Sequence, residues 1–277
     1  MVIFPLIILA LVQGVTEFLP ISSSGHLVLV HNFFGENSGW QDHLVLDVAV
    51  HVGTLLSVLI YFRNDVIAML CGALGWIKGD FKSTGSRLTI HLLIASIPVI
   101  AAGFMLNMFQ PAWILLLNVM ALATLIFGIL LWIADRRPSQ DKTLEDLSFK
   151  DVIIIGCAQA LALVPGTSRS GVTMTAARFL GYSRTESAHF SLLLAIIAIA
   201  GAGTVGGVEL IQNGNAALGL EALIAGFIAF IAGWVSITLM MKWLEKCSFA
   251  PFAIYRIILG LALLTVINWE LIYGLLV

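Results

Sequence analysis

The stretch from Gln13 to His26, with the sequence QGVTEFLPISSSGH, holds residue types that could do chemistry. Glu17 offers a carboxylate that could bind a metal ion or accept a proton, and His26 could transfer a proton near neutral pH. Between them lie the helix-breaking Pro20 and three consecutive serines, and apolar residues flank the whole stretch. Because ionisable and polar groups are costly in lipid, we interpret this stretch as functional.

A second polar stretch, Gln159 to Thr173, has the sequence QALALVPGTSRSGVT. Its glycines let the backbone turn and expose N–H groups, and the following helix offers its positive N-terminus. Together with Arg169 and the neighbouring hydroxyls, these groups are typical of a phosphate-binding site. A purely structural ion pair between Glu17 and Arg169 is the alternative interpretation.

The composition places both stretches in a membrane protein. Of the 277 residues 60% are hydrophobic and only 11% are charged, and the mean hydropathy is +1.02. A soluble domain is nearer a quarter charged, so we predict a polytopic membrane protein. The three cysteines are isolated in the sequence and suggest neither a disulfide nor a metal site.

Six apolar segments each have a length near the ~20 residues that a full span needs. Two further apolar regions, 1–34 and 152–181, are interrupted in the middle by Pro, Gly and Ser. Each half of these regions is too short to cross, so a re-entrant helix–loop–helix is the natural interpretation. The predicted spans cover approximately residues 45–62, 88–106, 112–134, 186–208, 217–241 and 251–273.

Lys and Arg gather in alternate connecting segments. The loops predicted at 63–87 and 135–151 are basic, whereas 31–44 and 209–220 contain neither residue type. This asymmetry predicts that both termini lie outside, that the first broken region opens outward and that the second opens inward.

The two broken regions also indicate an internal repeat. Pro20 and Pro165 are each followed by hydroxyl residues and glycine, and then by three spans. Three spans per half is an odd number, so the halves run in opposite senses. We therefore predict an all-α integral membrane protein with six full transmembrane helices and two re-entrant elements, in which inverted repeats 1–134 and 152–277 are joined by a cytoplasmic loop at 135–151.

Other polar residues in the apolar segments have simpler interpretations. A packed or interfacial role is expected for His51 and His91, and close packing for Thr175, Ser187 and Ser191. The three serines after Pro20 are different, because they precede Gly-His at a helix break, and we favour a functional role for them.

The two polar motifs together resemble the undecaprenyl-diphosphate phosphatase family of bacteria, the bacitracin-resistance type. The resemblance rests on EFLPISSSGH and PGTSRSGVT, in the same order, and is supported by LDVAVHVGT and FAPFAIYR elsewhere in the chain. It implies an integral enzyme of the bacterial inner membrane, which hydrolyses undecaprenyl (C55) diphosphate to undecaprenyl phosphate and recycles the lipid carrier for cell-wall synthesis.

The resemblance also implies the site residues. The catalytic residues would be Glu17, Ser23, His26 and Arg169, and the family's Glu/Gln-x-x-x-Glu motif falls on Gln13 and Glu17 as ligands of a divalent cation, Mg²⁺ or Ca²⁺. Gln13 is the neutral variant of that motif. The substrate-binding residues would be Ser22, Ser24, Gly166, Ser168, Ser170, Gly171 and Thr173.

Several points stay open at this level. The nucleophile is either Ser23, assisted by His26, or a water activated by Glu17 or His26, with Ser23 slightly favoured. A polyprenyl-phosphate flippase or secondary transporter is the rival function, since inverted repeats with broken helices are typical of transporters as well. We expect a polyprenyl diphosphate and membrane lipid as partners and no nucleic acid. The oligomeric state is left open, with a homodimer as one alternative.

Overall fold

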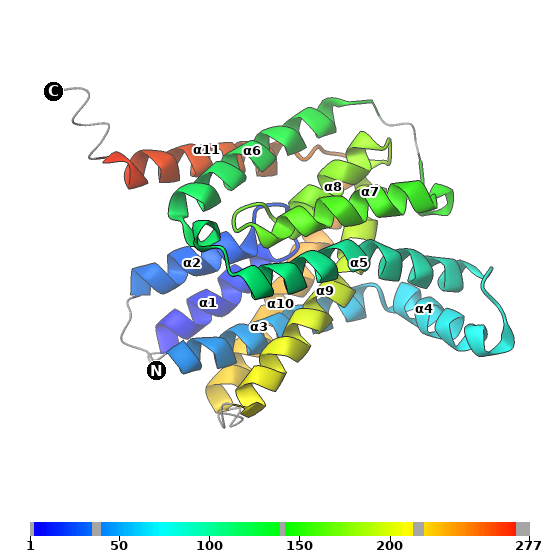
Figure 1. Cartoon of the computed structure of the whole chain (residues 1–277), viewed down its shortest axis with the longest axis horizontal. Helices are drawn as coiled ribbons and strands as arrows, with labels where there is room; N and C mark the ends of the chain where they lie inside the picture. The colour runs from blue at the N-terminus through cyan, green and yellow to red at the C-terminus, as the bar shows by residue number, and fades with distance from the viewer. Residues whose placement is uncertain (1–2, 35–39, 139–141, 213–218, 270–277) are drawn as a thin grey trace.

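The computed structural model describes residues 3–34, 40–138, 142–212 and 219–269, which form a bundle of helices (Figure 1). In chain order the helices are α1 (Ile3–Thr16), α2 (Ser23–Phe34), α3 (Trp40–Tyr61), α4 (Arg63–Gly75), α5 (Thr84–Phe109), α6 (Leu117–Arg136), α7 (Phe149–Ala160), α8 (Arg169–Phe179), α9 (Arg184–Gln212), α10 (Leu220–Leu244) and α11 (Ala250–Ile267), with short 3₁₀ turns η1 (Trp76–Lys78), η2 (Ala112–Leu115), η3 (Leu144–Asp146) and η4 (Leu161–Leu163). An isolated bridge between Lys142 and Tyr182 is the one strand-like contact in these ranges.

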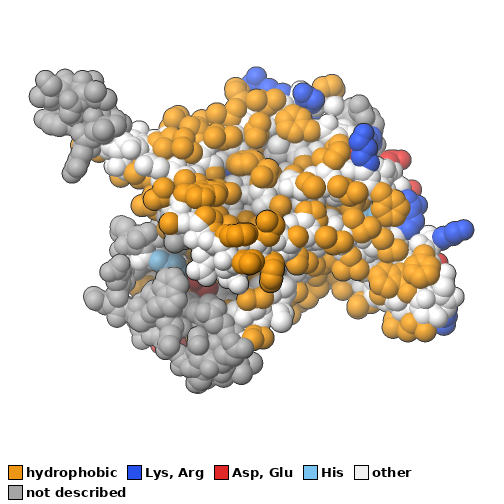
Figure 2. Space-filling model, viewed as in Figure 1, with side chains coloured by type: hydrophobic (Ala, Val, Ile, Leu, Met, Phe, Trp, Pro, Cys, Tyr) orange, Lys and Arg blue, Asp and Glu red, His pale blue; other side chains and the backbone are white. Residues whose placement is uncertain are grey.

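The expected all-α membrane fold is confirmed. Helices α5, α6, α9, α10 and α11 are each long and apolar enough to cross a membrane. The pair formed by α3 and α4 passes the same test as one span bent by 86°, which gives five spans in the described residues, or six with the bent pair. All six predicted spans overlap one of these helices. Figure 2 shows why such a bundle needs lipid, because hydrophobic side chains cover most of the visible face while Lys and Arg lie at its margin.

The segment 63–87, which the sequence analysis interprets as a loop, is a helical hairpin instead. Helix α4 occupies its first half and packs against the start of α5. The two backbones touch at glycines: a Cβ on Gly85 would lie 2.0 Å from the carbonyl oxygen of Ala68, and one on Gly72 would lie 2.3 Å from the Ser86 nitrogen. The loop prediction was wrong here because the charges and glycines that suggest a loop also permit this close packing.

Both predicted broken regions contain two helices separated by a break. In the first, α1 ends before Pro20 and α2 begins at Ser23; in the second, α7 and η4 end before Pro165 and α8 begins at Arg169. The two helices of each pair contact each other. Ser22 and Ser168, one in each break, both have a left-handed backbone, with φ of 76° and 69°. Each of these residues also begins the same sequence motif, Ser-x-Ser-Gly, at 22–25 and at 168–171.

The halves exchange their packing partners. Helix α1 packs on α10 while α7 packs on α5, and α3 contacts α10 while α9 contacts α5. A glycine makes each of the first two contacts close: a Cβ on Gly14 would meet Ala229 and Ala232, and one on Gly156 would meet the Ala95 backbone. This exchange is consistent with the predicted inverted repeat of 1–134 and 152–277, which stays a prediction.

Arg256 on α11 ties the two breaks together. Its side chain is fully buried, and its guanidinium donates to the carbonyl oxygens of Pro20 (3.4 Å), Gly166 (2.9 Å) and Thr167 (2.7 Å). These carbonyls lie outside regular helices, so they need donors from elsewhere in a bundle that excludes water. One side chain from the end of the chain thus sets the distance between the two breaks.

We expect Arg256→Met to lower the thermal midpoint of the purified protein in detergent. Met keeps the apolar stem of the side chain but leaves three buried carbonyls without their donor, and losing hydrogen bonds to a charged group costs about 2 kcal/mol or more. Arg136→Met, at an exposed position, is the control and should leave the midpoint near that of the parent. An unchanged midpoint for Arg256→Met would show that the breaks hold their places without it.

Candidate active site

The start of the first break carries a buried carboxylate, that of Glu17. Glu17 follows directly on α1, and its side chain is 8% exposed. Its Oε2 accepts hydrogen bonds from Gln13 Nε2 at 3.0 Å and from Ser23 Oγ at 2.7 Å. Gln13 lies one helical turn before Glu17 and Ser23 is the first residue of α2, so the break folds its hydroxyl back onto the carboxylate that precedes it.

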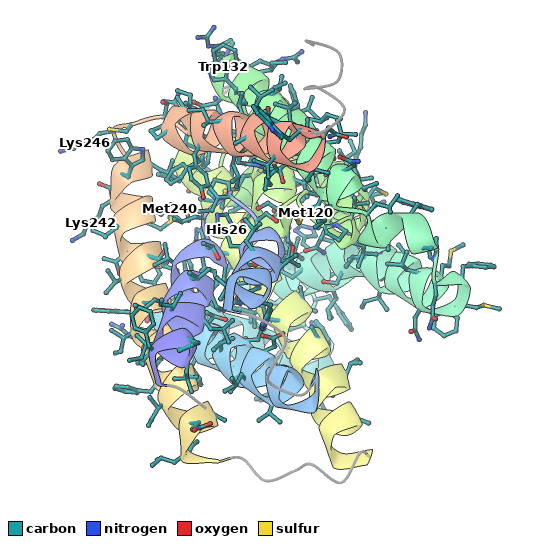
Figure 3. All side chains as sticks on the ribbon, turned by 90° about the vertical axis from the view of Figure 1, so that its left-hand side faces the viewer. His26, Met120, Trp132, Met240, Lys242 and Lys246 are labelled. Atoms are coloured by element: carbon teal, nitrogen blue, oxygen red, sulfur yellow. The ribbon has the colours of Figure 1, made fainter. Side chains whose placement is uncertain are left out.

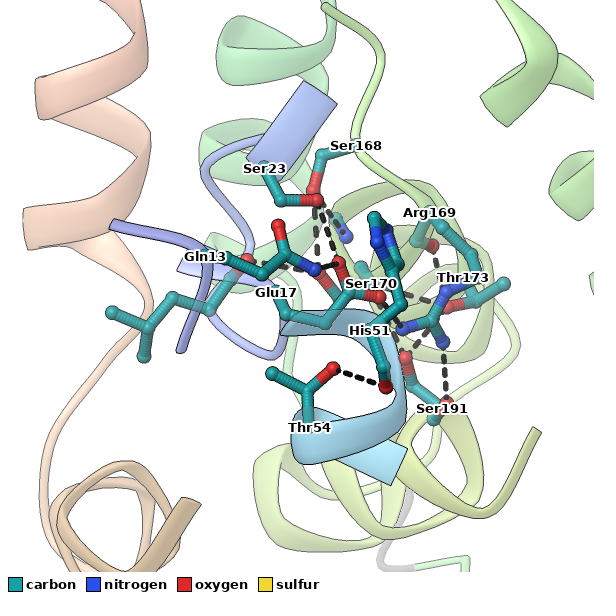
Figure 4. Close-up of polar contacts among 12 residues, drawn as sticks. Gln13, Glu17, Ser23, His51, Thr54, Ser168, Arg169, Ser170, Thr173 and Ser191 are labelled. Carbon is teal, nitrogen blue, oxygen red and sulfur yellow. Dashed lines mark hydrogen bonds and ion pairs between the residues drawn. The ribbon is translucent and has the colours of Figure 1, made fainter. Parts of the chain in front are cut away.

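A positively charged side chain, that of Arg169, follows directly on the second break. Arg169 is the first residue of α8, and its Nη2 donates to Glu17 Oε1 at 3.2 Å, which joins the two halves of the chain (Figure 4). Its Nη1 donates to the carbonyl oxygen of Ser191 on α9 at 3.3 Å. Glu17 therefore accepts from Gln13, Ser23 and Arg169 at once, which offsets the cost of burying its charge.

The serines on both sides of Arg169 fix the second break. Ser168 caps α8, since its Oγ accepts the Gly171 N–H at 3.1 Å. Ser170 Oγ donates to the Leu19 carbonyl in the first break at 2.9 Å and lies 3.2 Å from Ser168 Oγ. Thr173 is one turn further along α8 and bonds Ser191 Oγ at 2.7 Å. These hydrogen bonds fix the backbone on both sides of Arg169 and so position its side chain.

A cavity of about 300 Å³ lies between the breaks. Seven of the predicted site residues line it: Glu17, Ser22, Ser23, Ser24, Ser168, Arg169 and Ser170. An apolar wall comes from α5, η4 and α9, through Val99, Ala162, Leu163, Ala198, Ile199 and Ala202. The cavity thus combines a polar, charged end with a wall suited to hydrocarbon.

Other predicted site residues lie beside this cavity and not on its surface. Gln13 reaches it only through Glu17. His26 has both ring nitrogens engaged, Nδ1 with the Ser22 carbonyl and Nε2 with Tyr255 Oη, each at 2.6 Å; Figure 3 labels it at α2. Gly166 has a left-handed backbone (φ 89°), and a Cβ there would lie 2.2 Å from the Met120 carbonyl. Gly171 packs equally tightly against Arg256.

Two residues that the sequence analysis did not place in the site line the cavity. His51, expected to be packed or interfacial, faces it from α3. Its Nδ1 lies 2.6 Å from the Asp47 carbonyl, and because a carbonyl only accepts, Nδ1 carries the proton and Nε2 is an acceptor. The spacing of Asp47, His51 and Thr54 along one face of a helix is the signal that could have revealed it.

Gln159 is the second. Its side chain is fully buried at the end of α7, and its Nε2 donates to the Ala95 carbonyl at 3.4 Å. Its Oε1 has no hydrogen-bond donor, and the same is true of Oε1 of Gln13. Gln13 and Gln159 hold the same place relative to the two Ser-x-Ser-Gly motifs, so the repeat itself could have pointed to this residue.

Comparison with known proteins gives a consistent result. The family profile described as bacitracin resistance protein BacA matches residues 6–262. The undecaprenyl-diphosphatase of Hahella chejuensis is 45% identical over 260 residues, which cover 94% of this chain and 96% of that protein. The undecaprenyl-diphosphatase of Maricaulis maris is 46% identical over 264 residues, covering 94% and 97%, and that of Jannaschia sp. is 44% identical over 267 residues, covering 96% and 99%. With this coverage and these motifs, the chain belongs to the bacitracin resistance protein BacA family.

Proposed function

We propose that this membrane protein is an undecaprenyl-diphosphatase, which hydrolyses undecaprenyl diphosphate to undecaprenyl phosphate and inorganic phosphate and so recycles the lipid carrier for cell-wall synthesis. The observation that carries the proposal is the meeting of Ser23, Glu17 and Arg169 from two separate breaks in one cavity. A nucleophile, a proton acceptor and an anion-binding group are the parts that phosphoryl transfer needs.

Arg169 is our candidate for binding the diphosphate. Its planar guanidinium can hold two phosphate oxygens at once, and the serines around it can add hydrogen bonds. Because Arg169 bonds Glu17 in this structure, an incoming phosphate would take over that contact. The exchange would weaken the hold on the Glu17 carboxylate at the moment when the substrate is in place.

We assign Ser23 as the nucleophile and Glu17 as its proton acceptor. The 2.7 Å hydrogen bond between them supports this assignment over one in which water attacks. Ser23 Oγ would attack the terminal phosphorus, its proton would pass to Glu17, and the bond from phosphorus to the bridging oxygen would break, which releases undecaprenyl phosphate. A water molecule would then hydrolyse the phosphoserine and release inorganic phosphate.

His26 lies one turn after Ser23, and with its two short hydrogen bonds it holds the beginning of α2. We propose that it supports Ser23 from this place. It can move a proton in the reaction only after its bond to Tyr255 has opened. His51 lines the cavity, and the Nε2 of its neutral ring can accept a hydrogen bond.

The residues present fit a divalent cation, which remains a proposal with Mg²⁺ or Ca²⁺ as the candidates. The unpartnered, buried Oε1 of Gln13 lies beside the Glu17 carboxylate, and such oxygens are the ligands that these ions prefer. The Oε1 of Gln159 is a second unpartnered oxygen at the cavity. When bound, the cation would neutralise charge on the diphosphate. The described residues hold no group of three His, Cys, Asp or Glu, so neutral oxygens would have to complete its shell.

The prenyl chain would lie along the apolar wall of the cavity. Val99 on α5 and Ala198 and Ala202 on α9 line the same cavity as the polar residues. Both helices are apolar enough to lie in a membrane. We propose that the head enters between these helices while the tail stays in lipid. A small water-soluble diphosphate would gain nothing from this wall.

We place the protein in the bacterial inner membrane, with both termini outside and the first break opening outward. The support is the Lys and Arg content of alternate loops. We also propose that the helix pairs α1–α2 and α7–α8 each enter and leave the membrane on the same side, because neither α1 nor α7 is long enough to span it.

The purified protein should release phosphate from undecaprenyl diphosphate, and a chelator should abolish the release until Mg²⁺ or Ca²⁺ is added back. Phosphate is measured colorimetrically, with heat-unfolded protein as the control. Activity that is indifferent to chelator would remove the cation from the proposal. If no phosphate is released at any cation concentration, the transporter alternative gains support.

Glu17→Gln should lower phosphate release by roughly 100-fold or more, since a positioned general base contributes about 10²–10⁴ in rate. The variant keeps the size of the side chain but cannot take the proton of Ser23. The thermal midpoint measured on the same preparation is the control. A parallel fall of both quantities would indicate that the pair with Arg169 is structural, and near-parent release would exclude Glu17 from catalysis.

Arg169→Lys should reduce kcat/KM by about 30-fold or more, which corresponds to roughly 2 kcal/mol of transition-state stabilisation. Lysine keeps the charge but loses the planar fork. Arg63→Lys, an exposed position on α4, is the matched control and should behave like the parent. Should Arg169→Lys retain full activity, the residue acts only as a point charge.

A membrane-impermeant maleimide should leave Cys71 and Cys247 unmodified in intact cells and label them after permeabilisation. Both lie next to basic segments, and the chain is given a Cys157→Ser background so that only these two report. A cysteine placed at the exposed Gln110, in a background without the other cysteines, should be labelled in intact cells. The opposite labelling pattern would reverse the proposed orientation.

A further inference from the structure

A second polar cavity, of about 570 Å³, lies at the basic end of the bundle and shares no lining residue with the cavity between the breaks. It is formed where α6 ends, α9 begins, and α10 turns into α11. Figure 3 shows Trp132 on α6, Lys242 on α10 and Lys246 just after α10 toward this same end. Trp132, Pro138, Leu244 and Ala250 give the cavity an apolar side. This position corresponds to a membrane–water interface, where an aromatic residue and basic groups meet lipid headgroups.

The charge of the cavity is positive. Four arginines line it, Arg136, Arg137, Arg178 and Arg184, against two carboxylates, those of Asp135 and Glu245. Both carboxylate oxygens of Asp135 already accept a hydrogen bond, Oδ1 from Arg184 Nε at 2.6 Å and Oδ2 from the backbone N–H of Phe249 at 3.1 Å. Its charge is shared between Arg184, which it bonds, and Arg178, so the two carboxylates balance only part of the charge of the four arginines.

Arg136 and Arg137 are held in place without a carboxylate partner in the described part of the chain. The guanidinium of Arg136 stacks over the ring of Trp132 at 4.0 Å, and that of Arg137 lies over the ring of Phe179 at 4.9 Å. Stacking fixes the plane of a guanidinium but leaves the N–H groups at its edge free to donate. Two ordered forks without an anion are thus available at this cavity.

Arg178 adds a buried charge behind them. Only 3% of the residue is exposed, and its Nη atoms donate to the carbonyl oxygens of Tyr182 and Arg137. Its Nε has no acceptor in the described residues. Asp135, the carboxylate whose charge acts on Arg178, is also bonded to Arg184 at 2.6 Å, so an anion in the adjacent cavity would further stabilise this buried guanidinium with its free donor.

We propose that this cavity is an anion site that binds a phosphate group, carried either by an anionic lipid headgroup or by free inorganic phosphate. Guanidinium forks match phosphate oxygens bidentately, and several arginines are needed because a phosphate carries more than one acceptor oxygen. The apolar side of the cavity, next to the membrane surface, suits the glycerol end of a phospholipid. The site is separate from the cavity that holds Glu17 and Arg169 and does not depend on the proposed enzymatic activity.

The test uses the double variant Arg136→Gln, Arg137→Gln of the full-length protein. One arm exposes delipidated parent and variant to equal amounts of phosphatidylglycerol and phosphatidylcholine and measures retained lipid by native mass spectrometry. The other arm titrates inorganic phosphate into each protein in neutral detergent by calorimetry. We expect the parent to bind phosphatidylglycerol in preference to phosphatidylcholine, or to bind inorganic phosphate, and the variant to bind the same probe at least tenfold more weakly. The arm in which binding appears identifies the source of the phosphate group.

The matched control is Lys242→Gln, Lys246→Gln, which removes the same charge from the same end of the bundle but from residues that do not line the cavity. This control should retain the binding of the parent, and thermal midpoints should show all three proteins folded. Because Arg136 and Arg137 are exposed, their replacement is compatible with folding. The proposal is overturned if the parent binds neither probe, if the arginine variant binds as the parent does, or if the lysine control loses binding equally.

Discussion

The hydrogen bonds of the buried Arg256 are the constraint on which the site depends. A broken helix in a membrane protein leaves carbonyl groups without intrahelical donors, and lipid supplies none. Arg256 reaches from α11 to the first break through Pro20 and to the second through Gly166 and Thr167. Because one guanidinium bonds carbonyls of both breaks, it links their positions. A positive charge with no exposed surface is otherwise costly, so these carbonyl contacts are what keep it in place.

Once the breaks are held together, the chemistry follows from which residues they carry. The acid comes from the first break and the arginine from the second, and they meet at 3.2 Å although they are 152 positions apart. Ser23 completes the arrangement from the start of α2. Each partner compensates for the burial of another, so the site is stable without ligand and still contains groups that a phosphate can displace. This is consistent with an enzyme that must admit a highly charged head into an apolar surrounding.

Two extensive sets of polar groups are buried in a largely apolar bundle. One set lines the cavity between the breaks, and the other lies at the basic end, where Asp135, Arg178 and Arg184 join α6, α8 and α9. Apolar side chains spread over much of the face seen in Figure 2. Lipid therefore cannot satisfy these groups, and each set is closed by hydrogen bonds to carbonyls of neighbouring helices.

The sequence by itself determined the membrane class, the position of the spans and the two breaks, because hydropathy and Pro-Gly-Ser interruptions are local properties. It also predicted a site with Glu17, Ser23 and Arg169, since charges and clustered hydroxyls are conspicuous in apolar segments, and the folded chain brings these three residues to one cavity. Only the tertiary structure decided that α4 is a helix, because its stability comes from packing on α5 through Gly72 and Gly85.

The same holds for the neutral or distant members of the site. Gln159 and His51 are ordinary in their own helices, and they became site residues because the folded chain directs them into the cavity. Arg256 lies far along the sequence from both breaks, and nothing in its neighbourhood indicates which carbonyls it binds. Contacts of this kind depend on how helices from the two halves pack, and periodicity within one helix carries no information about them.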